Sequence, residues 1–328
     1  QVGTKQEILQ GISVQDSVNH YSELVPLEID PVISNPEPVQ SSSGALQFSK
    51  LVEFSLHHLL REPTKFVRAM IADLMASREL AWRLFVRDFS AQYRNSILGY
   101  AWAFIPPVVA SLPFIYLNSA GVMRIGETPI PYAAYAMVGT IIWQTFVDAL
   151  NSPLRTVNPA RSILTRINFP REAVLLAGLM QVGFSFLVRL ALLIAVFAAF
   201  ALDPAPTVPL FFVGMLSVAL TGFMIGLILT PIRLLYGHVP QSLPIASTFL
   251  MLLTPVLYPV PTTGLGATIA GLNPLTPLIT TTRDWLTTGA APEVGGFVLV
   301  TFVAVTFLVF GWVAYRLALP HLIARLGN

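Results

Sequence analysis

Charged side chains gather in two short tracts, the first of which is residues 71–97. Apolar side chains recur there at spacings of three and four, and Arg83, Arg87 and Arg94 lie along a different face. The pattern predicts an amphipathic helix in the membrane plane, with its arginines at anionic headgroups. A plain soluble amphipathic helix is the alternative. The apolar stretch that begins at Gly99 favours the membrane surface.

The second tract, "LTRINFPREAVL" at residues 164–175, interrupts a very apolar part of the chain. It carries Arg166, Arg171 and Glu172, and it is too polar for a membrane span. Pro159 and Pro170 delimit about ten residues, which is long enough for a short helix. The alternative is an arginine cluster that only fixes the orientation of the chain in the membrane.

Several kinds of chemistry are excluded by what the sequence lacks. The chain has no cysteine, which excludes disulfides and thiol catalysis. Lys5, Lys50 and Lys65 stand outside any glycine-rich phosphate loop, so the chain cannot hydrolyse ATP by that route. His57 and His58 form the only histidine pair, and a solvated helix end explains them better than zinc does. The net charge of +2 suggests no nucleic-acid partner.

The composition predicts an all-α integral membrane protein. Hydrophobic residues make up 54% of the 328 residues and charged residues only 11%, and the mean hydropathy is +0.69. Soluble domains carry about 25% charged residues. Six apolar stretches are each close to the length that crosses a bilayer, at residues 100–120, 132–149, 173–201, 208–232, 242–260 and 294–318.

The distribution of Lys and Arg predicts the topology. Fifteen of these residues flank the spans on one side and two, Arg124 and Arg283, on the other. By the positive-inside rule both termini are cytoplasmic, and no cleavable signal peptide is visible. The connection at 261–293 then faces outward, and we expect short helices that dip back into the outer leaflet.

The chain divides into four parts in this interpretation. Residues 1–49 are rich in Ser, Pro and acids and are predicted to be a disordered or loosely ordered tail. Residues 50–99 form a cytoplasmic segment with the membrane-surface helix. Residues 100–320 form the transmembrane domain, and residues 321–328 a cytoplasmic end.

Arg189 is the one clearly intramembrane charge in this topology. An unpaired arginine there would cost on the order of 3 kcal/mol. Two roles for Arg189 are equally compatible with the sequence. One is contact with an anionic substrate, and the other is a hydrogen bond between helices or subunits. Asp148 is placed near a cytoplasmic helix end and Asp203 in an outer loop. The absence of buried acids argues that the driving force for transport comes from elsewhere.

Small and aromatic residues mark further candidate contacts within the spans. Gly222 and Gly226 form a small-xxx-small pattern that allows close helix contact. Aromatic side chains cluster in the first two spans, among them Trp102, Tyr116 and Trp143. They suit stacking on sugar rings, although interfacial belts and ordinary packing explain most of them.

Several stretches resemble the polysaccharide-exporting ABC-2 permeases, in order over residues 72–318. They are "RDFSAQYRNSILGYAWAFIPP" (87–107), "IPYAAYAMVGTIIWQTFVDALNS" (130–152), "NPARSILTRINFPREAV" (158–174), "TPVLYP" (254–259) and "LNPLTPLITTTRDWL" (272–286). The Phe-Pro-Arg-Glu end of the third is the most specific mark. Pro107 departs from the more usual Pro-Leu pair.

The resemblance implies a fold, a function and partners. The fold is the type V ABC exporter fold, with six transmembrane helices after an amphipathic interfacial helix. The protein would be the permease subunit that moves a lipid-linked O-antigen, capsule or related glycan across the bacterial inner membrane. Its partners would be a second copy, two ATPase subunits that bind ATP and Mg²⁺, membrane lipids, and periplasmic or outer-membrane export components. The chain itself would need no cofactor and catalyse no reaction.

The resemblance also implies site residues. An ATPase-coupling loop would use Arg161, Arg166, Asn168, Phe169, Pro170, Arg171 and Glu172, with Phe169 as an apolar knob. The interfacial helix would hold an undecaprenyl-type lipid diphosphate near Arg83, Arg87, Asp88, Tyr93 and Arg94. Trp102, Tyr116, Trp143 and Arg189 are candidates for the translocation pathway, and Tyr258, Asn273, Pro274 and Arg283 for an outer gate.

Two other functions stay open from the sequence. One is an ABC-2 exporter of a drug or simple lipid, although the order of motifs speaks against it. The other is a membrane-bound glycosyl-transfer or lipid-modifying enzyme with Asp148 or Asp203 as its acid. No paired acids or metal-ligand spacing support the enzyme.

Overall fold

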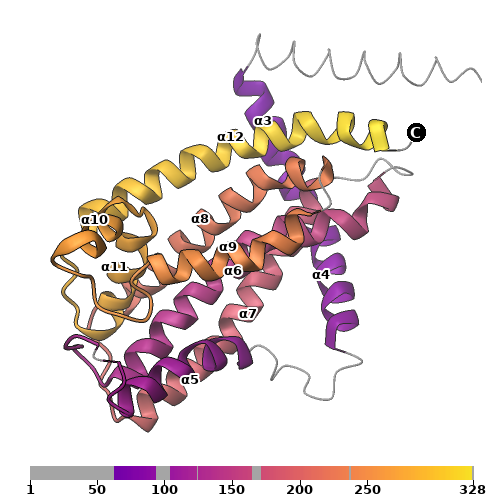
Figure 1. Ribbon diagram of the computed structural model, residues 1–328. Coiled ribbons are helices and arrows are strands. Elements are labelled where there is room, and N and C mark those ends of the chain that lie inside the picture. Colours follow the sequence, from indigo (N-terminus) through magenta and orange to yellow (C-terminus); the bar gives the residue numbers. More distant parts are fainter. Residues whose placement is uncertain (1–62, 94–103, 124, 165–170, 236–237, 327–328) are drawn as a thin grey trace, which may run out of the picture. The chain divides into compact units, whose positions relative to one another are not determined.

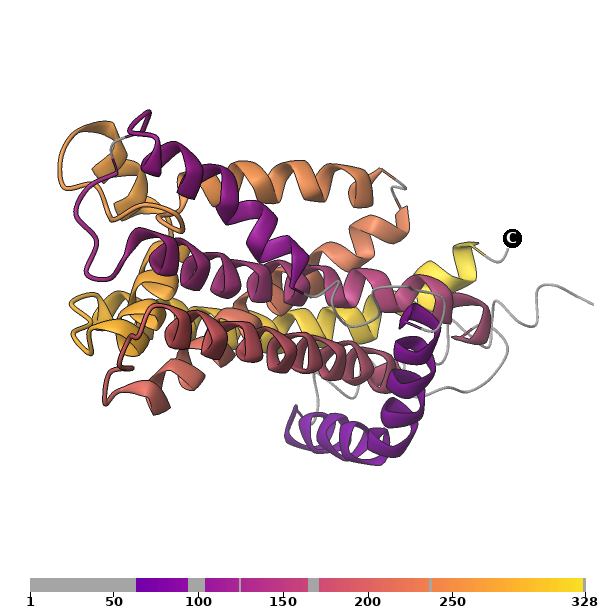
Figure 2. The same cartoon turned by 90° about the horizontal axis from the view of Figure 1, so that it is seen from below.

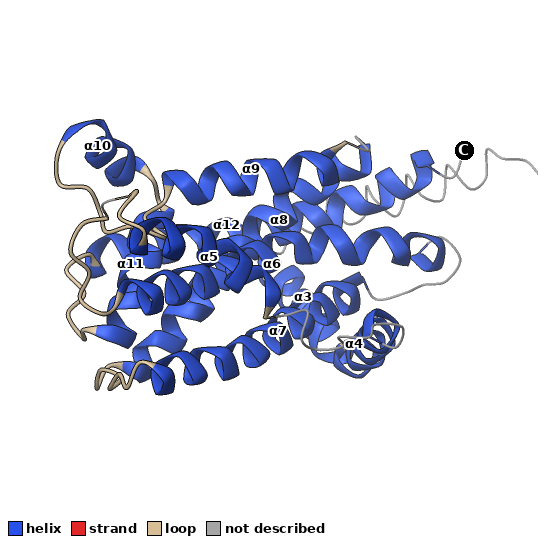
Figure 3. Cartoon of the chain, turned by 60° about the horizontal axis from the view of Figure 1, so that its bottom comes forward, coloured by secondary structure: helices blue, strands red, loops and turns tan. Residues whose placement is uncertain are grey.

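The computed structural model describes residues 63–93, 104–123, 125–164, 171–235 and 238–326. All of these belong to one of the two compact units of the chain, residues 48–328. The regular elements of the described ranges are all α-helices, as predicted (Figure 3). They are α3 (Pro63–Ala76), α4 (Arg78–Tyr93), α5 (Ile105–Ser119), α6 (Tyr132–Leu164), α7 (Arg171–Ala199), α8 (Val208–Leu235), α9 (Val239–Leu253), α10 (Gly264–Leu272), α11 (Leu275–Thr287) and α12 (Val294–Leu326).

Four of these helices contain a segment long and apolar enough to cross a membrane. The segments are Tyr132–Thr156 of α6, Glu172–Ala199 of α7, Val208–Arg233 of α8 and Val294–Arg316 of α12. The predicted first and fifth spans correspond to shorter apolar helices, α5 and α9. The structure therefore supports a multi-span helical protein, and four of the six predicted spans reach full length.

Helix α9 ends earlier than the sequence pattern predicts. The predicted span 242–260 is wrong at its end, because the helix stops at Leu253 and Thr254 is extended (φ −101°, ψ 137°). Pro255 follows, and a residue before proline is driven out of the helical region. In the predicted outer connection, α10 and α11 are the short helices that we expected.

Helix α6 is the centre of the packing (Figure 1). It makes its most extensive contacts with α8 and α7, and α8 packs in turn on α12 and α11. Gly222 and Gly226 of α8 lie against the α6 backbone. A Cβ added at Gly226 would lie 2.1 Å from the carbonyl oxygen of Leu150, and one at Gly222 would lie 2.5 Å from that of Phe146. The small-residue pattern is therefore a real helix contact.

The predicted single helix over 71–97 is wrong, because the chain bends between α3 and α4 at Ser77 (Figure 2). Ser77 is fully buried, and its hydroxyl donates to the carbonyl oxygen of Asp73 at 2.6 Å. Serine that bonds the carbonyl four residues back bends a helix. Beyond the bend, α4 packs on α7, where the rings of Phe89 and Phe184 lie 4.4 Å apart, edge to face.

Candidate coupling and translocation sites

The helix before the predicted coupling tract is longer than expected. Helix α6 runs through Pro159 to Leu164, so Pro159 does not begin a separate short helix. A proline inside a helix removes one backbone donor but does not end the helix where neighbouring groups satisfy the freed carbonyl. Arg166, Asn168, Phe169 and Pro170 lie outside the described residues. Of Arg161 and Arg171 the structure gives only the backbone, in α6 and at the start of α7.

Glu172, the last member of the predicted coupling loop, points into the protein. Its side chain is 8% exposed, and its Oε1 lies 3.3 Å from Nη1 of Arg316 on α12. Nη2 of the same arginine donates to the carboxylate of Asp73 on α3. One guanidinium thus joins α3, α7 and α12. Glu172 thus links helices within this protomer, and its assignment to the ATPase-coupling tract stays a prediction.

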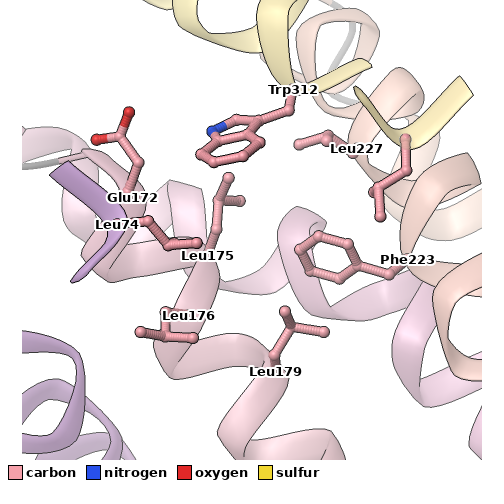
Figure 4. A pocket seen from close by; sticks show the side chains of 9 residues that line it. Leu74, Glu172, Leu175, Leu176, Leu179, Phe223, Leu227 and Trp312 are labelled. Carbon is pink, nitrogen blue, oxygen red and sulfur yellow. The ribbon is translucent and has the colours of Figure 1, made fainter. Parts of the chain in front are cut away.

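An apolar cavity of about 170 Å³ lies beside this ion-pair cluster. Figure 4 shows its wall, to which α3, α7, α8 and α12 contribute. Leu175 and Phe223 face it, and the Trp312 indole lies on one side. The carboxylate of Glu172 is turned away from the leucines of its own helix. The cluster is therefore backed by apolar side chains on one side, where few polar groups compete for its charges.

Arg189 is paired with the acid that the sequence placed at a helix end. Nη2 of Arg189 lies 2.6 Å from Oδ2 of Asp148, joining α7 to α6. The arginine side chain is 4% exposed and the aspartate side chain 22% exposed. Of the two interpretations that stood level for Arg189, the structure shows the bond between helices. It also shows that Asp148 is a partly buried acid, which the sequence interpretation had excluded.

The remaining pathway candidates have different surroundings. Trp143 is 2% exposed and its ring lies 5.2 Å from that of Phe146 in the packed core, so the protomer offers no open surface at Trp143. Tyr116 on α5 is 68% exposed. Trp102 lies outside the described residues.

The predicted outer residues converge on one segment, residues 254–258. Arg283, which the topology placed outside, is 2% exposed and donates to the carbonyl oxygens of Pro255 (3.2 Å) and Val256 (3.3 Å). Its guanidinium lies 3.9 Å from the ring centroid of Tyr135. The Tyr135 hydroxyl donates to the carbonyl of Tyr258 at 3.3 Å. Backbone carbonyls and a ring face thus replace water around the arginine.

Asn273 fixes the other end of this segment. Its Nδ2 donates to Oγ1 of Thr254 at 2.8 Å, and its Oδ1 accepts from the backbone N–H of Leu275 at 3.0 Å. Pro274 is exposed and precedes α11 directly. The structure therefore joins Tyr258, Asn273 and Arg283 in one cluster. Thr254 and Tyr135 are members that sequence reasoning missed, although "TPVLYP" includes the first and the "PYAAY" start of α6 the second.

The predicted headgroup residues lie on the exposed side of α4. Arg83 pairs with Glu79 at 2.6 Å, and Arg87 pairs with Asp88 at 2.8 Å. All four side chains are at least 37% exposed. Trp82 is also exposed, at 56%. Tyr93 ends the helix with its side chain outside the description, and Arg94 lies outside the described residues.

No family model matches the chain. The chain is 26% identical over 214 residues to the O-antigen export system permease protein RfbA of Myxococcus xanthus. The match covers 64% of this chain and 81% of that relative. The chain is a homologue of an O-antigen export permease. This homology supports the family predicted from the sequence motifs, the ABC-2 permeases of polysaccharide exporters.

The ABC-2 permease family fits the geometry in two ways. Four helices of the described chain contain apolar segments of membrane-spanning length. Two charged residues of the motifs make contacts between elements, since Glu172 pairs with Arg316 of α12 and Arg283 of α11 packs on Tyr135 of α6. The homology therefore favours a transport subunit over a catalytic enzyme.

Proposed function

We propose that the protein is the permease subunit of an ABC exporter that moves a lipid-linked polysaccharide across the bacterial inner membrane. The homology to an O-antigen export permease over 81% of its length carries this proposal. The apolar helices of α6, α7, α8 and α12 support it. Two copies would form the membrane part, with both termini in the cytoplasm, and the shorter helices α5 and α9 would complete six spans in each.

Two separate ATPase subunits would supply the energy in this proposal. The chain lacks a phosphate-binding loop, so ATP and Mg²⁺ would bind to those subunits. Residues 165–170, between α6 and α7, would contact the ATPase, with Phe169 as the apolar knob. The ion pairs of Arg316 with Asp73 and Glu172 support this assignment, because they link the start of α7 to α3 and α12. A displacement of residues 165–170 would therefore be transmitted to all three helices.

The exposed arginine face of α4 would hold the diphosphate of the lipid carrier. Guanidinium groups pair well with phosphate oxygens, and the ion pairs of Arg83 and Arg87 are on the surface, where exchange for a phosphate costs little. Periplasmic or outer-membrane components would take the glycan onward.

The proposal is tested by co-expressing the chain with an ATPase subunit encoded beside it. We expect the two to co-purify, and lipid-linked glycans to stimulate ATP hydrolysis in proteoliposomes. Deletion of the gene in its native host should leave the glycan in the cytoplasmic leaflet. Surface glycan at the parental level in that deletion strain would contradict the proposal.

A further inference from the structure

Polar side chains recur along one face of α6 and one face of α7, on either side of the ion pair that joins the two helices. The set, here called the polar seam, comprises Gln144, Asp148, Asn151 and Arg155 of α6 and Gln181, Ser185 and Arg189 of α7. Within each helix the spacings are three or four, so each group lies on one helical face. The Asp148–Arg189 ion pair joins the two faces.

The α6 side of the polar seam is not packed into the core. The spanning segment of α6 is 72% buried, the highest share among the four candidate spans. Phe146 and Leu150 pack their backbones on Gly222 and Gly226 of α8. Gln144, Asn151 and Arg155 lie on the opposite side of the helix, where the first two are half-buried and the third exposed. Between Gln144 and Thr156, the α6 side chains that are not fully buried are polar, apart from Val147.

The open sides of other spans are apolar. Leu187 and Ile194 of α7 are 61% and 63% exposed, and Phe302 and Phe310 of α12 are 69% and 65% exposed. These faces suit hydrocarbon. Amide and charged groups directed at hydrocarbon cost several kcal/mol and instead face a water-filled cavity or a polar partner. The polar seam therefore does not face lipid.

Arg189, which pairs with Asp148 at the centre of the polar seam, has two nitrogens without a hydrogen-bond partner among the described residues. Arg189 is 3% exposed, and one of its nitrogens bonds Asp148. Its Nε and Nη1 are the two nitrogens without such a partner. Buried N–H groups of this kind are costly unless water or a ligand accepts from them. Both nitrogens are buried in the protomer, so the side chains of the seam that a ligand can reach are those of α6.

The chemistry of the polar seam suits a hydroxyl-rich chain rather than an ion. The charges of Asp148 and Arg189 cancel, Arg155 adds one exposed positive charge at the end of the seam, and the other side chains are amides and a hydroxyl. Amides and hydroxyls both donate and accept hydrogen bonds, as sugar hydroxyls do. We propose that the polar seam is part of the wall along which the glycan passes, with Gln144 and Asn151 as contact residues. This inference rests on the proposed function.

Cysteine accessibility tests the proposal cleanly, because the chain contains no cysteine of its own. Gln144→Cys and Asn151→Cys are compared with Leu187→Cys and Phe302→Cys in the assembled exporter, in inside-out vesicles. Only a thiol in contact with water ionises and reacts, so we expect a water-soluble methanethiosulfonate reagent to label the first pair at least about tenfold faster. Labelling of the first pair should also block export.

Two results would overturn the proposal. One is that the polar-seam cysteines label no faster than Leu187→Cys. The other is rapid labelling that leaves export unchanged, which would mean water without passage of glycan. Labelling needs no glycan, so failure of the proposed function appears separately, as a parent chain that exports none. As a second variant, Gln144→Leu with Asn151→Leu should lower export several-fold while co-purification with the ATPase persists, and Leu187→Ala should change neither.

Discussion

The guanidinium of Arg283 lies 3.9 Å from the ring centroid of Tyr135 and fixes α11 against the start of α6. The two residues are far apart in sequence, and both are buried. The same guanidinium donates to the carbonyls of Pro255 and Val256, which follow the end of α9. One side chain therefore joins α11, the start of α6 and residues 255–256, and its loss should weaken the contacts among all three.

Replacement of Arg283 by Gln should destabilise the protein, because two charge-assisted hydrogen bonds and the contact with the Tyr135 ring are lost. We expect a loss on the order of 2 kcal/mol or more, measured as a lower thermal midpoint in detergent. Arg283→Lys keeps a cation over the ring and should lose less. Equal midpoints for the two variants would show that the charge contributes nothing.

A methyl group at Gly226 should push α8 away from α6. Its Cβ would lie 2.1 Å from the carbonyl oxygen of Leu150, and this backbone atom cannot move without shifting the helix. Overpacking of this kind costs about 1–3 kcal/mol. Gly183→Ala is the matched control, because a Cβ there meets nothing within 4 Å. Thermal midpoints of the purified variants compare the two, and no drop specific to Gly226→Ala would argue against the contact.

Phe169→Asp should uncouple ATP hydrolysis from export. If Phe169 inserts into an apolar socket of the ATPase, as proposed above, a charge there would weaken binding by about 2 kcal/mol or more, as for other interface anchors. Membrane insertion should stay normal, because the arginines that fix the orientation remain. Phe169→Leu is the control and should retain most activity. Coupled export by the Asp variant would favour a tract that only sets topology.

Neutralising Arg83, Arg87 and Arg94 to Gln should abolish export without preventing ATPase assembly. The ion pairs lost are exposed, so stability should change by less than about 1 kcal/mol. Arg78→Gln is a control on the opposite side of α4, because Arg78 precedes Arg83 by five residues. Export and co-purification are measured in parallel. Normal export by the triple variant would contradict the proposal that these arginines bind the lipid headgroup.

Asp284 should make stability depend on pH. Burial raises its pKa from 3.8 to about 6, although Arg283 acts to lower the pKa and Glu293 to raise it. The folded state therefore holds the proton more tightly than the unfolded state, so stability falls as the pH rises from about 4 to 6 and is level above that. Asp284→Asn should raise the thermal midpoint at pH 7.5 and change it little at pH 4. A midpoint difference that is the same at both pH values would contradict this.

Hydrophobic period and length predicted the helical class and the long spans, because both depend on local sequence. The bend at Ser77 was missed, since it depends on a hydroxyl turned back onto the carbonyl of Asp73. The length of α6 beyond Pro159 was missed for the converse reason, because a proline marks a helix end only when nothing else sustains the helix. The predicted helix boundaries were thus wrong where a single hydrogen-bonding group determines whether the helix bends or continues.

The sequence singled out Asp148, Arg189 and Arg283 one by one, but it did not show which groups they contact. Asp148 and Arg189 are 41 positions apart, so no sequence spacing reveals their ion pair. Arg283 was counted as an outer flanking charge, yet carbonyls and a ring enclose it. The positive-inside rule counts arginines along the chain and takes no account of the groups that surround each one. The four-residue steps from Gln144 to Asp148 and from Asn151 to Arg155 were a visible signal of the polar seam.

The glycines of α8 set where this protomer is able to bend. Where backbone meets backbone, as at Gly226 and Leu150, there is no layer of side chains to shear, so α6 and α8 behave as a single lever. We therefore expect relative motion to occur where the chain leaves its helices, as at the bend between α3 and α4 and after Leu253, rather than between α6 and α8. Two glycines thereby make the α6–α8 contact one along which the helices are not expected to slide.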